Sequence, residues 1–328
     1  MLNRTLKFAL PAALAMLLTA CGQEAEKKSA KTLYLEGYQQ LTAPTAQYNF
    51  NADIKLDGSQ FEAMLADVKL SLNGAVDMAG KKFEVTPEVK AAMFQIRLPI
   101  SLDLKQEHIV IDPVDIISAM QMFQPDAAGV VERYKNKFIR LKKSNLELDE
   151  EQQQELDTAL DAAGQIFEIA FDVAEKASQD LPESSFQLKD LGESGKQSDV
   201  STAISLVLSA EQRQEFERAI LVQFRERLQA STVADEIKQQ ILAGLEEAET
   251  MDRPEEAVDS VVYLNAKGQV VRVNDRYTYL IEGKQAFMDV NVAFSQYGQA
   301  KFSIAPAATD IIDIDEEEIA TVQMLMGK

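Results

Sequence analysis

The stretch YNFNADIKL, Tyr48 to Leu56, decides the fold of this chain. Apolar and polar residues alternate along it without a break. The apolar set is Tyr48, Phe50, Ala52, Ile54 and Leu56, and the polar set is Asn49, Asn51, Asp53 and Lys55. Because successive side chains of a strand point to opposite faces of a sheet, the alternation predicts an antiparallel strand with one buried and one solvated face.

The same period of two recurs in neighbouring stretches and near the carboxyl end. VKLSLNGAVDM (Val68–Met78) and AMFQIRLPISLDL (Ala92–Leu104) continue the strand-rich zone, and Pro99 on the polar side of its strand indicates an edge or a bulge. Two hairpins are predicted further on, one around Asn265–Gly268 and the other around Tyr297–Gly298.

Between these zones the apolar residues follow helical spacing. A first helix is predicted from Asp149 to a point before Pro182. A second begins at Ser209, where a glutamine three residues later completes a capping-box pattern. A third is expected over about 232–249, and a short strand over 203–208 precedes the second helix.

The order strands, helices, strands predicts an α+β fold with helices on one side of an antiparallel sheet. We expect a single domain over residues 33–306. Its parts are strands at 48–148, helices at 149–249 and strands at 258–304, and an acidic C-terminal tail at 307–328 follows.

The first twenty residues predict a signal peptide. Arg4 and Lys7 flank the start of an apolar run, Phe8–Leu18, that is shorter than the roughly 20 residues a membrane span requires. The run ends in LTAC, which resembles the bacterial lipobox. That resemblance implies cleavage between Ala20 and Cys21 and acylation of Cys21, with palmitate among the attached chains.

Several acyl chains at one point would anchor the protein stably to a membrane, whereas a single chain holds it only marginally. Gly22 resembles the residue that favours export to the outer membrane in enteric-type lipoproteins, and residues 21–32 read as the acylated cysteine and a flexible tether. The alternative is an ordinary signal peptide whose Cys21 simply precedes a linker.

Composition excludes some partners. Removal of residues 1–20 takes away Arg4 and Lys7, which leaves 31 basic against 53 acidic residues and a net charge of −22. Nucleic acid, which requires a basic patch, is therefore not an expected partner. Cys21 is the only cysteine, so the fold has no internal disulfide.

Catalytic signatures are missing from the sequence, and we predict that the protein is not an enzyme and needs no cofactor. His108 is the only histidine, there is no G-x-S-x-G motif, and no glycine-rich phosphate loop occurs. The acidic cluster Asp310–Glu318 lacks the glycine and spacing of a calcium loop, so we interpret it as a solvated tail and predict no metal site.

Two apolar features leave alternatives open. Phe167 and Phe171 of the first helix make it apolar on more than one face, which indicates either core packing or a lid over an apolar hollow. The stretch AMQMF, Ala119–Phe123, is the densest methionine-containing patch, and methionine suits adaptable apolar surfaces.

With these features in place, the chain resembles the bacterial lipoprotein-carrier architecture shared by LolA, LolB and LppX. The resemblance covers roughly Leu33 to Pro306, and IDP (Ile111–Pro113) is similar to a turn motif of LolA-like sequences, without its tyrosine. It implies a curved antiparallel β-sheet, a half-barrel, with helices packed on one face. In that architecture the hollow holds acyl chains.

Two functions follow as hypotheses. The first is an outer-membrane-anchored lipoprotein, facing the periplasm, that binds an acyl-chain ligand (a lipid or another lipoprotein) in an apolar hollow. The second is a structural or assembly lipoprotein that binds a periplasmic protein partner and no small molecule. The two differ in whether the helices leave the sheet face open or fill it, and a lid and a plug have the same amphipathic pattern.

Overall fold

The computed structural model describes residues 28–57, 68–91, 94–123, 132–142, 162, 165–166, 168–170, 172–191, 199–250, 255–281, 284–315 and 318. Residues 1–27, which carry the predicted signal peptide, Ala20, Cys21 and most of the tether, lie outside the described residues. The predicted helix start Asp149 and the side chains of Phe167 and Phe171 also lie outside them.

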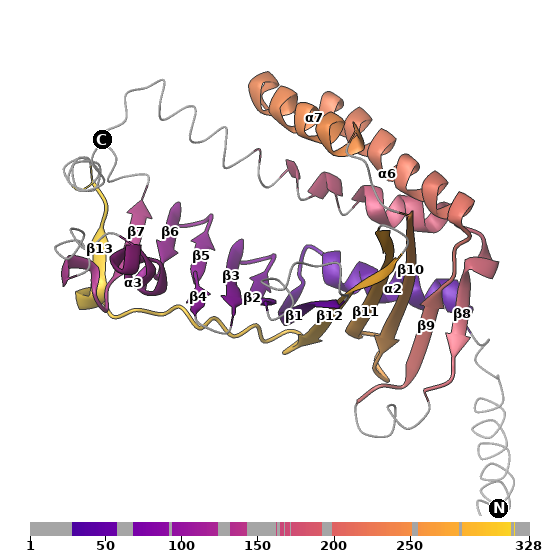
Figure 1. Cartoon of the computed structure of the whole chain (residues 1–328), viewed down its shortest axis with the longest axis horizontal. Helices are drawn as coiled ribbons and strands as arrows, with labels where there is room; N and C mark the ends of the chain where they lie inside the picture. Colours follow the sequence, from indigo (N-terminus) through magenta and orange to yellow (C-terminus); the bar gives the residue numbers. More distant parts are fainter. Residues whose placement is uncertain are drawn as a thin grey trace, which may run out of the picture.

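The described residues form one sheet of thirteen strands, and Figure 1 shows these strands in a row from β13 at one end to β8 at the other. The order is β13-β7-β6-β5-β3-β2-β1-β12-β11-β10-β9-β8, with β4 pairing beside β5 on β3. The strands are β1 (Gln47–Asp57), β2 (Lys69–Asp77), β3 (Lys82–Lys90), β4 (Gln95–Arg97), β5 (Ile100–Asp103), β6 (His108–Ile111), β7 (Phe138–Lys142), β8 (Phe186–Lys189), β9 (Thr202–Leu206), β10 (Glu255–Leu264), β11 (Val270–Ile281), β12 (Lys284–Ser295) and β13 (Ile311–Asp313).

The predicted α+β class with a curved sheet is confirmed, because the sheet is open, curved and not closed into a barrel. One detail of the prediction is wrong: the sheet is mixed, since β13 pairs with β7 in parallel while the other described pairs are antiparallel. The zones are also less pure than expected. The short strand expected at 203–208 is present as β9, but β8 inside the helical zone 149–249 was not expected, and β13 falls inside the segment 307–328 that we expected to be a solvated tail.

The pairing register places the apolar side chains of neighbouring strands on the same face. Ile54 of β1 is opposite Val290 of β12 on one side and Leu70 of β2 on the other. On the other face, Asp53 is flanked by Asn291 and Ser71. The alternation of Tyr48–Leu56 therefore extends across the sheet, which has one apolar and one polar face.

The descriptions of the individual strands from the sequence were mostly accurate. The hairpin at Asn265–Gly268 is confirmed, with Gly268 at a φ of 74° that a residue with a side chain rarely adopts. Pro99 separates β4 from β5, so the expected single strand is two short ones that both pair with β3. The predicted hairpin at Tyr297–Gly298 is only a turn, because the chain after it forms no ladder with β12.

Instead, residues 296–310, here called the C-terminal strap, cross the polar face from β12 towards β7 (Figure 1). Glu84 of β3 is buried beneath the strap, and its carboxylate accepts hydrogen bonds from the backbone amides of Ser303 and Ile304 at 2.8–2.9 Å. Asn49 of β1 bonds the amide and carbonyl of Lys301. These contacts fasten the strap across the sheet and deliver the chain to β13.

The long helices with given bounds are α2 (Ala30–Thr42), α3 (Val114–Phe123), α6 (Ala210–Ala230) and α7 (Asp235–Thr250). Residues 172–180 are also helical and lie within the first helix predicted from the sequence. The capping box at the start of α6 is confirmed, since Ser209 and Gln212 exchange both bonds. Helix α2 was not predicted, because its first residues read as part of the tether. Short 3₁₀ turns lie at Glu183–Ser185 and Ala308–Asp310.

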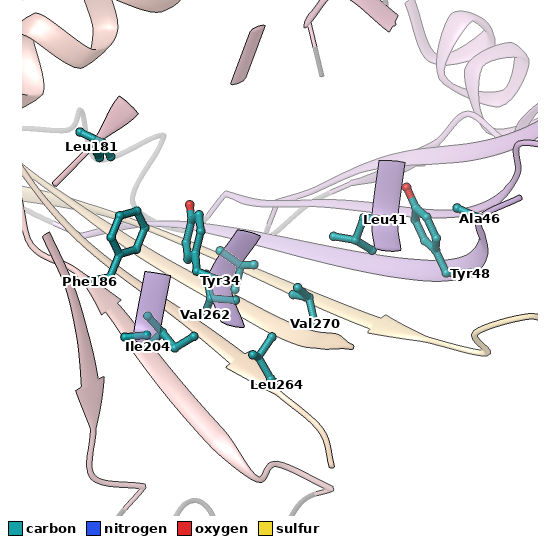
Figure 2. Close-up of a cluster of buried hydrophobic side chains, with 12 residues drawn as sticks. Tyr34, Leu41, Ala46, Tyr48, Leu181, Phe186, Ile204, Val262, Leu264 and Val270 are labelled. Atoms are coloured by element: carbon teal, nitrogen blue, oxygen red, sulfur yellow. The ribbon is translucent and has the colours of Figure 1, made fainter. Parts of the chain in front are cut away.

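Helix α2 packs on the apolar face at the β8–β11 end of the sheet, and its buried residues lie one turn apart on one side. Figure 2 shows Tyr34 and Leu41 among strand residues that include Val262 and Val270. Gly37 permits this close approach, since a Cβ there would lie 2.9 Å from Leu264 Cδ2. The main core is therefore α2 against the strands at this end.

A candidate apolar binding face

The apolar face of the sheet continues well beyond the part that α2 covers. One row runs across five strands in register, through Val290, Ile54, Leu70, Val89 and Ile96. Two flanking pairs extend it, Leu56 opposite Met288 and Leu72 beside Ala52. We call the following eight residues the apolar platform: Ile54, Leu56, Leu70, Leu72, Val89, Ile96, Met288 and Val290.

Every residue of the apolar platform is partly exposed, and none belongs to a fully buried cluster of the described residues. A folded protein of this size would normally bury such a run of aliphatic side chains completely. The row from β12 to β4 covers four strand spacings, or roughly 19 Å. That is the length of a long acyl chain rather than of one inserted side chain.

Among the described helices, α2 and α3 lie at the two ends of this part of the apolar face. Helix α2 contacts β8 and β11, while Ile117 of α3 packs with Tyr134, Ile139 and Ile312 near β7 and β13 (Figure 1). Ile139 of β7 also lies on the apolar face. It pairs with Ile111 of β6, and the pairing continues through β5 to β3, in the row next to the platform. Helices α2 and α3 thus lie on either side of the platform, and α3 also contacts β4, which carries Ile96.

The α2 end of the platform carries a polar group. Asp275 of β11 lies on the apolar face, in the same row as the platform, between Ser260 of β10 and Val290 of β12. Tyr34 and Tyr38 of α2 are close enough for its charge to affect them, and their rings lie 4.8 Å apart. A carboxyl and two phenols therefore lie near one another where the covered core ends and the platform begins.

Burial sets the protonation of this cluster. It raises the pKa of the Asp275 carboxyl, against a smaller opposing effect of the hydrogen bond from Ser260. It also raises the pKa of Tyr34 to about 12 and that of Tyr38 well above its usual value, and the nearby Asp275 charge adds to both shifts. The phenols are neutral donors at physiological pH.

The structure brings few of the residues singled out in the sequence into this face. His108 lies at the start of β6 in register with Asp103 and Lys142, at the far end of the sheet. The stretch Ala119–Phe123 forms the end of α3, which accompanies that same end. Among the residues the structure describes, no three His, Cys, Asp or Glu side chains are grouped to hold a metal ion.

The acidic cluster Asp310–Glu318 is only partly the solvated tail we expected: Asp313 and Asp315 are exposed, but the segment is held to the sheet. Arg140 of β7 forms a two-pronged ion pair with Asp313, at 2.6 and 2.7 Å, and this bond lowers the pKa of the Asp313 carboxyl. Glu318 is buried and accepts hydrogen bonds from Arg133 and Tyr134. These acids therefore hold β13 against β7, which is a structural role.

Sequence reasoning missed Asp275, Tyr34 and Tyr38. Asp275 interrupts the apolar alternation of its hairpin, VVRVNDRYTYLI, and an acid at an inward position was the available signal. The two tyrosines, four residues apart, share one side of α2, which the sequence did not lead us to expect as a helix.

Comparisons with known proteins add no family to this description: no family model matches the chain, and no curated protein is significantly similar to it. Within the described part of the chain, no helix is both long and apolar enough to cross a membrane. The features of this chain that point to a function are therefore the apolar platform and the sequence of the first residues.

Proposed function

We propose that the protein is an outer-membrane-anchored periplasmic lipoprotein that binds the acyl chain of a lipid, or of another lipoprotein, on the apolar platform. The observation that carries the proposal is the aliphatic row through β12, β1, β2, β3 and β4, which stays partly exposed between α2 and α3. An acyl chain that covers such a row gains about 0.8 kcal/mol for each methylene removed from water.

The anchor rests on the sequence. The stretch LTAC with Cys21, preceded by a short apolar run, supports acylation, and Gly22 supports the outer membrane as the destination. A protein held at a membrane surface meets acyl chains at high local concentration, which fits a face that binds them. Metabolic labelling with a palmitate analogue tests this part: the wild-type chain should be labelled and Cys21→Ser should not.

A second candidate function has its own observation. Strand β8 is an edge of the sheet, and Leu188 on it is 64% exposed, so another protein could add a strand there. This is the assembly role expected as the alternative. It predicts a partner that cross-links to β8 and no lipid on the apolar platform.

The test of the proposed function compares two neighbouring substitutions on β1. The protein is the chain from residue 21 onward with Cys21→Ser, which contains every residue that the structure describes. Ile54→Asn places an amide on the apolar platform, whereas Asp53→Asn places the same side chain on the polar face. Binding of a fluorescent acyl probe is measured for each variant.

Ile54→Asn should weaken binding of the probe by about tenfold, since about 1–2 kcal/mol of apolar contact is lost. Asp53→Asn should leave binding within twofold of the parent chain. Equal binding by all three chains, or no binding by the parent, would contradict the proposal. Circular dichroism of each variant confirms that the sheet is intact.

A further inference from the structure

Asp275 does not have the surroundings of a residue that stabilises the fold. It lies on the apolar face of β11, and its strand neighbours towards the platform are Val290 and then Ile54. One carboxylate oxygen, Oδ1, is buried and has no hydrogen-bond partner among the residues that the structure describes. A buried acceptor without a partner costs about 1–3 kcal/mol of stability, and more when it is charged.

The neighbours of Asp275 do not compensate this cost with positive charge. Ser260 donates a hydrogen bond to the carboxyl, and the other groups near enough to be affected by its charge are the neutral phenols of Tyr34 and Tyr38. The arginines that flank Asp275 in sequence lie on the opposite, polar face: Arg276, for example, forms an ion pair with Asp289 there. A group that lowers stability and remains on the inner face is best explained by a role in binding.

The position of Asp275 also matches one end of a ligand. The row that begins at Asp275 continues through Val290, Ile54, Leu70 and Val89 without another polar side chain. A molecule lying along this row would therefore place a polar head at β11 and an aliphatic tail over the platform.

We propose that Asp275 binds the head group of the amphiphile that lies on the apolar platform, and that this head group donates hydrogen bonds, as an amine or a hydroxyl does. An anionic head, such as a free fatty acid's carboxylate, would meet a like charge and is disfavoured there. This inference rests on the proposed function, since it names the class of ligand that the same face takes.

The experiment uses three amphiphiles of equal chain length: a primary alkylamine, a monoacylglycerol and a fatty acid. Each is titrated into the chain from residue 21 with Cys21→Ser, and then into the same chain carrying Asp275→Asn or Asp53→Asn. Asp53→Asn is the matched control, because it removes one carboxylate from the polar face of the same sheet. The amine and the monoacylglycerol separate the two kinds of donor.

The parent chain and Asp53→Asn should bind the amine and the monoacylglycerol at least tenfold more tightly than the fatty acid. In Asp275→Asn, binding of the amine should be about tenfold weaker than in the parent chain. The affinities for the amine and for the fatty acid should then be similar. Urea unfolding is the second readout: Asp275→Asn should be as stable as the parent or more so, because it removes a poorly paired buried charge.

Three results would overturn the inference. The first is a parent chain that binds the fatty acid as tightly as the amine and the monoacylglycerol. The second is an Asp275→Asn chain that still prefers these two ligands to the fatty acid. The third is an Asp275→Asn chain that is clearly less stable than the parent, which would give the carboxyl a structural role. If none of the three amphiphiles binds the parent, the proposed function itself fails. The two failures are therefore distinguishable in one set of titrations.

Discussion

The close packing of β2 against its neighbours makes a prediction at Gly74. This residue lies on the apolar face of β2, opposite Phe50 of β1 and Val85 of β3. A Cβ added at position 74 would lie 2.3 Å from the backbone oxygen of Glu84 and 2.5 Å from two ring carbons of Phe50. Neither distance is tolerable, and one of the two neighbours is backbone, so Gly74→Ala requires the β2–β3 ladder to shift.

The magnitude follows from two opposing effects. Replacing glycine by alanine inside a strand normally stabilises by about 0.5–1 kcal/mol, because the unfolded chain loses freedom. Overpacking at a site that cannot relax costs about 1–3 kcal/mol. We therefore expect Gly74→Ala to lower the free energy of unfolding by about 1–2 kcal/mol.

Gly244 of α7 supplies the matched control, since a Cβ there has no neighbour within 4 Å among the described residues. Gly244→Ala should stabilise by about 0.5–1 kcal/mol. In thermal unfolding followed by circular dichroism the two variants should separate by about 4–8 °C, with the parent chain between them. A Gly74→Ala protein as stable as the parent, or one that follows Gly244→Ala, would refute the packing described for β1, β2 and β3.

Two further predictions concern the strap and the core. Glu84→Gln should lower stability by about 1–2 kcal/mol in urea unfolding and speed protease cleavage within residues 300–307, because a charged acceptor of the Ser303 and Ile304 amides is lost. Glu88→Gln on the same strand, whose partner Gln95 is exposed, should stay within about 0.5 kcal/mol; equal effects would contradict the role of the strap. Burial raises the pKa of Tyr34 to about 12, so the unfolded chain releases the Tyr34 proton first. This residue alone should lower stability by about 1.4 kcal/mol per pH unit between pH 10 and 12. Below pH 10 this contribution is fully present, and Tyr34→Phe should flatten the alkaline fall; an unchanged slope would place Tyr34 in water.

The sheet could be predicted from the sequence because the alternation at Tyr48–Leu56 is a local property of the chain. Strand pairing then carries that alternation across neighbouring strands, since a register shift of one residue would expose the apolar set. The capping box at Ser209 is local as well, and it was predicted correctly.

The parts that the sequence did not reveal depend on contacts between distant segments. Strand β13 is only three residues long, Ile311–Asp313, and it is held in the sheet by Arg140 of β7, which binds Asp313 across the ladder. Helix α2 has a mixed surface, and its place is set by Gly37 against β10 and by Lys31, which donates to the carbonyls of Gln179 and Leu181. Such pairings have no signature in the spacing of one segment.

Asp275 could be predicted from the sequence only in part. Its position on the inner face follows from the two-residue period of β11, but only the structure shows that no described cation is paired with it. An acid that breaks an apolar pattern is therefore a useful sign of a binding residue once the neighbours are known.

The most direct test of the account is native mass spectrometry of the chain from residue 21 with Cys21→Ser, purified from a bacterial periplasm. The account predicts a co-purifying mass that organic extraction removes and identifies as an acylated amphiphile with an amine or hydroxyl head group. The Ile54→Asn variant should carry less of it than Asp53→Asn. A bare protein mass, together with no uptake of an acyl probe, would contradict the claim that the apolar platform binds acyl chains.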